Sequence, residues 1–100
     1  MMQIKQSELF MQQFEEILFT IANDKVSAAL DFQKEVIEHF STLKSFPYKS
    51  RQSYYYYDDI RIRDLTVKGY TIIYRVNEEK ERIEVLEMFN RNLPVKKNGE

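Results

Sequence analysis

The chain changes its hydrophobic period at Pro47, and this change limits the folds open to it. Before that proline, apolar residues recur at every third or fourth position between residues 9 and 43, as on one face of an α-helix. After it, apolar and polar residues tend to alternate, as in a half-buried β-strand. Proline cannot continue a helix and biases Phe46 away from helical backbone. The sequence therefore predicts helices first and a sheet afterwards.

The helical half divides into two amphipathic segments separated by "ANDK" at residues 22–25. Ser7 directly precedes the first segment and is suited to cap a helix there. The first apolar stripe contains Leu9, Phe10, Phe14, Ile17, Leu18 and Ile21, and the second contains Ala28, Ala29, Phe32, Val36, Ile37, Phe40 and Leu43. Two helices with so short a link form an antiparallel hairpin, and their stripes need another layer to cover them.

A short strand is expected before the hairpin, at residues 2–6. Four runs rich in aromatic and β-branched residues follow the hairpin, at 53–57, 60–65, 70–76 and 83–89. The segments 66–69 and 77–81 between the last three runs are predicted turns. We therefore expect an α+β fold in which an N-terminal strand and a helical hairpin pack on a curled, mainly antiparallel sheet.

The composition fits one small domain, which we place at residues 1–94, with residues 95–100 as a flexible C-terminal tail. The 100 residues contain no cysteine, so a disulfide framework and a thiolate nucleophile are excluded. One histidine without cysteine argues against structural zinc, and no cofactor is predicted. No apolar run reaches the roughly 18 residues of a membrane span, and no signal peptide is evident. A cytoplasmic protein without a membrane partner is expected.

The formal net charge is only −1, but the charge is unevenly distributed along the chain. Residues 1–43 carry three basic and seven acidic side chains, whereas residues 44–75 carry seven basic and three acidic ones. A basic region attracts a phosphate backbone or an acidic protein segment. The alternative is an ordinary solvated face of a mixed sheet.

Four consecutive tyrosines lie within this basic region, in the stretch "RQSYYYYDDIRIRDL" at residues 51–65. In a strand their rings would alternate, with Tyr54 and Tyr56 on one side and Tyr55 and Tyr57 on the other. One pair would then pack on the helices, and the other would face water or a partner. The outward pair is either a pair of ordinary exposed aromatic side chains or part of a stacking surface beside Arg61 and Arg63.

Arg61 and Arg63 would share one face of the strand predicted at 60–65. Two like charges on one face repel each other unless an anion lies over them. His39, in contrast, lies beside the apolar stripe of the second predicted helix, away from the basic strands, and is interpreted as a structural or solvent-edge histidine.

The order of these elements, together with several short motifs, resembles the RelE/ParE superfamily, the toxins of bacterial type II toxin–antitoxin pairs. The motifs are "IRDL" at 62–65, Gly69 and Tyr70 opening a strand that ends "IYRV" at 73–76, and "IEVLEMFNR" at 83–91. The resemblance covers residues 2–94. It implies a basic sheet surface, a cognate antitoxin that covers the toxin, and contact with operator DNA only through that antitoxin.

One branch of this superfamily cleaves messenger RNA on the ribosome without a metal ion. Such cleavage needs proton-transfer groups and cations that stabilise the developing phosphorane charge. The best-known members have an arginine directly after the strand tyrosine, where this chain has Thr71 after Tyr70. By resemblance, Arg61 and Arg63 match the cations of the preceding strand and Arg91 matches a C-terminal arginine. No catalytic residue is assigned.

The ParE-like branch poisons DNA gyrase and needs a binding surface instead of a catalytic site. The run Arg63-Asp64-Leu65 and the strand end "YRV" at 74–76 resemble this branch more. We therefore predict a non-enzymatic toxin that acts on gyrase. The alternatives are a ribosome-dependent mRNA endoribonuclease and an inactive homologue that only binds the antitoxin. The predicted surface for target or antitoxin comprises Arg61, Arg63, Lys68, Arg75 and Arg91, with Tyr55 and Tyr57 as aromatic contacts.

Overall fold

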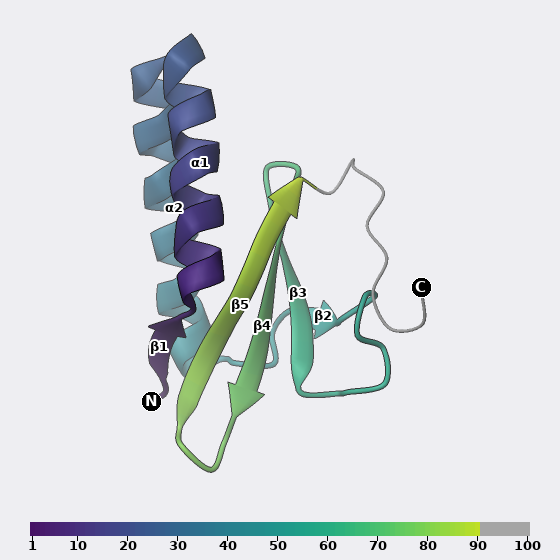
Figure 1. Cartoon of the computed structure of the whole chain (residues 1–100). Coiled ribbons are helices and arrows are strands. Elements are labelled where there is room, and N and C mark those ends of the chain that lie inside the picture. Colours follow the sequence, from purple (N-terminus) through teal and green to yellow (C-terminus); the bar gives the residue numbers. More distant parts are fainter. Residues whose placement is uncertain (91–100) are drawn as a thin grey trace.

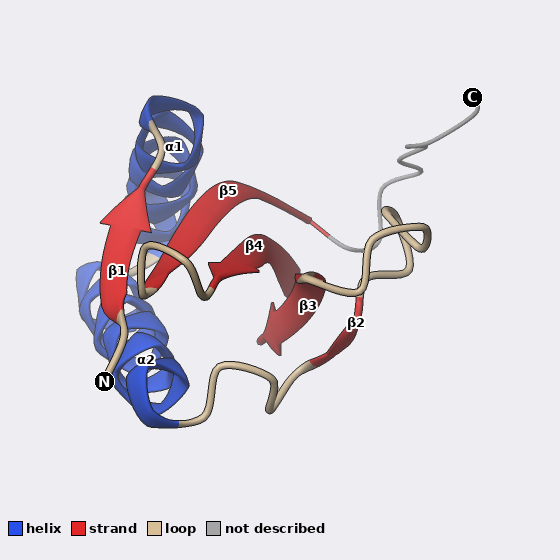
Figure 2. Ribbon diagram, turned by 90° about the horizontal axis from the view of Figure 1, so that it is seen from below, coloured by secondary structure: helices blue, strands red, loops and turns tan. Residues whose placement is uncertain are grey.

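The computed structural model describes residues 1–90, which form a helical hairpin packed on a five-stranded sheet (Figure 1). The elements in chain order are β1 (Gln3–Gln6), α1 (Glu8–Asp24), α2 (Val26–Ser45), β2 (Arg51–Gln52), β3 (Ile62–Val67), β4 (Tyr70–Asn77) and β5 (Arg82–Asn90). The strand order is β1-β5-β4-β3-β2, with β1 parallel to β5 and the other pairs antiparallel. Figure 2 shows that the sheet is curved, with β1 beside the helices and β2 at the far edge. The predicted α+β architecture is confirmed.

Ser7 caps α1 and also fastens it to the sheet. The backbone N–H of Phe10 donates to Ser7 Oγ at 2.9 Å, and the Ser7 hydroxyl donates to the carbonyl of Leu86 at 2.7 Å. The predicted cap is therefore confirmed. The predicted break at 22–25 is shorter than expected, because α1 continues to Asp24 and only Lys25 separates it from α2. No helix within residues 1–90 is long and apolar enough to cross a membrane.

The hydrophobic core lies between the helical hairpin and one face of the sheet. Its buried members are Phe10, Phe32, Val36, Phe40 and Leu43 from the helices and Leu65, Val67, Ile72, Tyr74, Val76, Ile83, Val85 and Met88 from the strands. Tyr74 is fully buried, and its hydroxyl donates to the carbonyl of Pro47 at 2.8 Å. This bond satisfies the buried phenol and fixes the link that follows α2.

The turn between β3 and β4 is tighter than predicted. Thr66 and Val67 still belong to β3, so only Lys68 and Gly69 form the turn, and both have positive φ angles of 45° and 85°. Two consecutive positive φ angles are typical of a type I′ hairpin turn. Both strands therefore pair up to the turn, from Val67 with Tyr70 onwards.

The strand predicted at 53–57 is wrong. Only Arg51 and Gln52 pair with β3, and residues 53–61, which we call the tyrosine loop, leave the sheet. Ser53 Oγ accepts the N–H groups of Tyr55 and Tyr56 at 3.1 Å each, and such side-chain acceptors compete with a strand ladder. Consequently the tyrosine rings do not alternate between two faces, and Arg61 lies outside β3, which begins one residue later.

Candidate functional site

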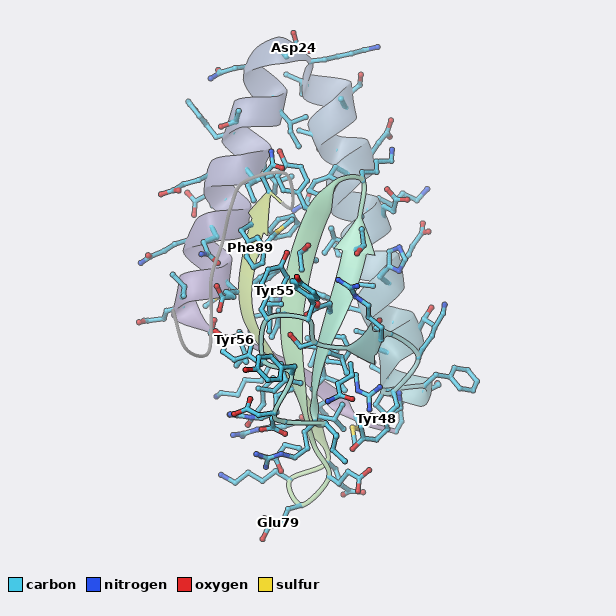
Figure 3. All side chains as sticks on the ribbon, turned by 90° about the vertical axis from the view of Figure 1, so that its right-hand side faces the viewer. Asp24, Tyr48, Tyr55, Tyr56, Glu79 and Phe89 are labelled. Carbon is cyan, nitrogen blue, oxygen red and sulfur yellow. The ribbon has the colours of Figure 1, made fainter. Side chains whose placement is uncertain are left out.

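The tyrosine loop lies over the face of the sheet that points away from the helices, which we call the outer face (Figure 3). The hydroxyl of Tyr56 donates to Glu87 Oε2 at 2.8 Å, and the ring of Tyr55 meets the ring of Phe89 edge-on at 5.0 Å between centroids. Glu87 pairs with Ile73 across β4 and β5. Ile73 is fully buried although its neighbours Ile72 and Tyr74 face the core. The loop thus covers part of the outer face.

Tyr56 serves as a hydrogen-bond donor in this arrangement. Burial, the hydrogen bond to Glu87 and the negative charge of Glu87 raise the pKa of the Tyr56 phenol to about 12. A phenol with so high a pKa stays protonated near neutral pH and cannot accept a proton there. Tyr56 is therefore suited to hold the loop on β5 rather than to act as a base.

Asp64 fastens the start of the tyrosine loop to β3. Its side chain is fully buried, and Oδ2 accepts from the backbone N–H of Tyr54 at 2.8 Å and from Arg51 Nη2 at 3.2 Å. The other oxygen, Oδ1, is buried without a hydrogen-bond partner, which costs stability. The acidic member of the Arg63-Asp64-Leu65 run therefore has a structural role, holding the loop through Oδ2.

Glu84 holds a group of charged side chains at the end of the outer face nearest the β4–β5 turn. Its carboxylate accepts from Arg75 Nε at 2.8 Å, Arg82 Nε at 2.8 Å and Asn77 Nδ2 at 3.2 Å. Burial alone would raise the pKa of Glu84, but the hydrogen bonds from Arg75, Arg82 and Asn77 outweigh it and lower the pKa to about 2. Arg75 is thus already paired with a charged carboxylate inside the chain.

Arg61 and Arg63 each have their own partners. Arg61 makes a bidentate pair with Asp59, with Nη2 2.9 Å from Oδ2 and Nε 3.0 Å from Oδ1, and these hydrogen bonds hold the pKa of Asp59 below its usual value. The guanidinium of Arg63 lies 4.8 Å from the centre of the Tyr48 ring and donates to the carbonyls of Ile60 and Ser50. An anion of the chain itself, Asp59, therefore lies against Arg61, as the expected need for a nearby anion requires, while Arg63 contacts an aromatic ring and two carbonyls.

The structure brings some of the predicted site residues together and separates others. Arg75 pairs in register with Ile62, so it lies at the same end of the sheet as Arg61 and Arg63. Lys68 lies at the opposite end of β3, where its Nζ is 3.6 Å from Glu35 Oε2. Arg91 lies outside the described residues, as does the tail predicted at 95–100.

The two tyrosines predicted as aromatic contacts differ in exposure. Tyr55 is half-buried against Phe89, whereas Tyr57 is exposed. The sequence reasoning missed the acidic side chains that organise this face, Asp64, Glu84 and Glu87. One signal for the last two was available, because acidic residues within an inner strand usually need buried partners.

No group of three or more histidine, cysteine or acidic side chains within residues 1–90 is arranged to hold a metal ion. What the outer face offers is aromatic rings, apolar side chains and arginines held by carboxylates. Such an arrangement can bind a partner, because the large side chains are displayed on a fixed backbone.

Comparison with known proteins agrees with the fold and the motifs. The family model described as "ParE toxin of type II toxin-antitoxin system, parDE" matches residues 4–92. A solved structure titled "Chromosomal ParDE TA system from P. aeruginosa" is similar with a TM-score of 0.71 and 18% sequence identity, over 90% of this chain and 96% of that chain. No curated protein matches. At this identity the structural likeness supports the fold alone, but the family model spans nearly the whole chain. The chain therefore belongs to the ParE toxin family of type II toxin–antitoxin systems.

Proposed function

We propose that this chain arrests bacterial growth by binding and poisoning DNA gyrase in the cytoplasm, and that a cognate antitoxin neutralises it. Membership of the ParE toxin family supports the toxin role and the antitoxin partner. The choice of gyrase rests on the resemblance to the ParE-like branch. Contact with operator DNA would then occur only through the antitoxin.

The observation that supports a non-enzymatic mode of action is that arginines of the outer face are paired with carboxylates of the same chain. Cleavage of RNA needs cations free to meet the phosphorane charge and a group that moves a proton. Arg61 and Arg75 are instead paired with Asp59 and Glu84. The position after Tyr70 holds Thr71, a neutral side chain that is 2% exposed. These features favour a binding surface over a catalytic site.

The helical hairpin offers a separate surface for the antitoxin. Phe19, Val26 and Leu30 are exposed and line one groove between α1 and α2, together with Leu18, Ala22 and Ala29. A group of adjacent exposed apolar side chains often marks a site of interaction with a partner. Glu15 at the same groove favours a basic residue on the antitoxin side. We infer that an amphipathic segment of the antitoxin covers this groove.

The direct test is pulse labelling after the chain is induced without its antitoxin. Labelled thymidine and labelled methionine are followed for the first minutes after induction. We expect incorporation of thymidine to stop while incorporation of methionine continues. An early stop in methionine incorporation would instead favour mRNA cleavage. Continued growth with folded, abundant protein would favour the inactive homologue.

The basic surface is tested with charge reversals. Arg61→Glu combined with Arg63→Glu should abolish growth arrest, while Lys34→Glu on the exposed side of α2 should leave it unchanged. Circular dichroism and the urea midpoint check that each variant is folded. A folded double variant that arrests growth as wild type does would remove these two arginines from the working surface.

A further inference from the structure

We infer that the outward edge of the tyrosine loop, formed by Tyr54, Tyr57 and Ile60, is the surface with which the toxin contacts its protein target. The inference rests on the proposed function, since it names the part of the chain that recognises gyrase. The three side chains are 72%, 66% and 66% exposed. Exposing three large apolar side chains within seven residues to water is unfavourable unless a partner covers them.

The four tyrosines divide into two functional pairs. Tyr55 and Tyr56 turn toward the sheet, where they contact Phe89 and Glu87. Tyr54 and Tyr57 are exposed, and the Tyr54 ring also meets the Tyr55 ring edge-on at 5.5 Å between centroids. The first pair holds the loop in place, whereas most of the surface of the second pair faces solvent. The exposed pair is therefore available for binding.

The backbone of the loop is fixed before any partner arrives. The N–H of Ser53 donates to the carbonyl of Ile62 at 2.8 Å, and the N–H of Asp59 donates to the carbonyl of Tyr56 at 3.1 Å. The side-chain amide of Gln52 donates to the carbonyl of Tyr57 at 2.9 Å. Because little backbone freedom remains to be lost, binding through this loop carries a small ordering cost. Tyrosines on a fixed loop are the usual anchors of protein recognition surfaces.

The charges around the loop favour a protein over a nucleic acid. Asp58 and Asp59 belong to the loop itself and offset part of the positive charge that would attract a phosphate backbone. Arg61 is engaged by Asp59, and the guanidinium of Arg51 lies over the Tyr54 ring at 5.9 Å while it pairs with Asp64. A stacked base would compete with Arg51 for that ring.

Residues 44–63 nevertheless carry five basic and two acidic side chains. The partner that fits is a folded protein surface with an apolar depression for the tyrosines and an acidic margin for the surrounding cations. This surface lies on the opposite layer of the molecule from the hairpin groove assigned to the antitoxin (Figure 1).

The test uses the full chain with Tyr54→Ala, Tyr57→Ala and Ile60→Ala combined. Purified gyrase is mixed with each toxin, and the accumulation of cleaved DNA is measured together with the affinity for the antitoxin. We expect the triple variant to need at least about tenfold more toxin for the same cleavage, with antitoxin affinity unchanged. The matched control, Phe19→Ala with Leu30→Ala in the hairpin groove, should show the reverse pattern. If the triple variant does not fold, the single variants Tyr57→Ala and Ile60→Ala carry the test, each with an expected loss of about threefold or more.

Each outcome separates the inference from the function on which it rests. If wild-type toxin poisons gyrase and the folded triple variant does so equally well, the loop is not the target surface, although gyrase remains the target. If wild-type toxin has no effect on gyrase, the proposed function fails and the inference falls with it. If the variant instead loses binding of a labelled single-stranded oligonucleotide that wild type retains, while gyrase poisoning is unchanged, the loop is a nucleic-acid surface and the inference is overturned.

Discussion

The phenol of Tyr56 donates a 2.8 Å hydrogen bond to the carboxylate of Glu87, and so joins the tyrosine loop to β5 across 31 residues of sequence. A run of four tyrosines that alternates as a strand would add an edge to the sheet. The same run, bent into a loop and held by this bond, covers the outer face instead. The bond therefore helps to hold Tyr56 against the sheet, while Tyr54 and Tyr57 remain exposed.

Tyr56→Phe should lower the free energy of unfolding by about 1–2 kcal/mol. The substitution keeps the ring but removes the donor that faces the buried Glu87 carboxylate. Urea denaturation at neutral pH measures the change as a shift of the midpoint. Tyr57→Phe is the matched control, because that side chain is exposed, and its midpoint should equal that of wild type. Equal midpoints for both variants would show that the bond contributes nothing to stability.

Ser53→Ala should loosen the loop without unfolding the domain. The buried Ser53 Oγ accepts the N–H groups of Tyr55 and Tyr56, so its loss leaves both donors without that acceptor. We expect these two amides to exchange with deuterium at least about tenfold faster, as local opening becomes easier. Ser41→Ala on the exposed side of α2 serves as the control. Unchanged exchange at Tyr55 and Tyr56 would mean that other contacts hold the loop.

The helices and the three long strands could be predicted from sequence because the spacing of apolar residues depends only on neighbouring positions in the chain. The Ser7 cap is equally local, since the residue and the amide that it accepts are three positions apart. The sequence wrongly predicts a strand at 53–57 because tyrosine favours strands, and the four tyrosines outweigh Ser53, the residue of the run that supplies a competing acceptor. One of the competing acceptors, Asp64, lies ten residues further along in β3, so its effect on Tyr54 depends on tertiary structure.

The candidate site was only partly predictable for the same reason. The sequence grouped Arg61, Arg63 and Arg75, and the strand register does bring them to one end of the sheet. It did not reveal that Arg75 pairs with Glu84, because that contact depends on the register of β4 against β5. An arginine count therefore overstated how much free positive charge this face offers. The exposed loop edge became visible only once the loop itself was known.

Gly69→Ala should destabilise the domain by about 1 kcal/mol, although the added methyl group meets no atom within 4 Å. The cost is conformational, because Gly69 has a φ of 85° and a side chain disfavours that backbone region. Glu81→Gly, at a φ of 51°, should have the opposite sign and stabilise the chain by a few tenths of a kcal/mol up to about 1 kcal/mol. Thermal or urea denaturation measures both. A Gly69→Ala variant as stable as wild type would argue against the type I′ turn.

Glu84 should make the stability of the domain sensitive to acid. The folded-state pKa of about 2 lies below the ordinary value of 4.5, so the carboxylate stabilises the fold fully above about pH 4.5. This contribution, on the order of 3 kcal/mol, is lost as the pH falls from there toward about 2. Glu84→Gln should be less stable near neutral pH, because Arg75 and Arg82 lose their charged partner.

The difference between Glu84→Gln and wild type should shrink as the solution is acidified. Urea midpoints are measured for both proteins at intervals between about pH 6 and pH 3. The two curves of midpoint against pH should converge, because protonation of Glu84 removes from wild type the negative charge that the substitution has already removed. Glu79→Gln, at the exposed β4–β5 turn, should run parallel to wild type. If the curve for Glu84→Gln also ran parallel to that of wild type, the stability contributed by the Arg75–Glu84–Arg82 group would not depend on the charge of Glu84. Because Arg75 belongs to the predicted target surface, loss of growth arrest in Glu84→Gln without loss of fold would further link this ion-pair group to target binding.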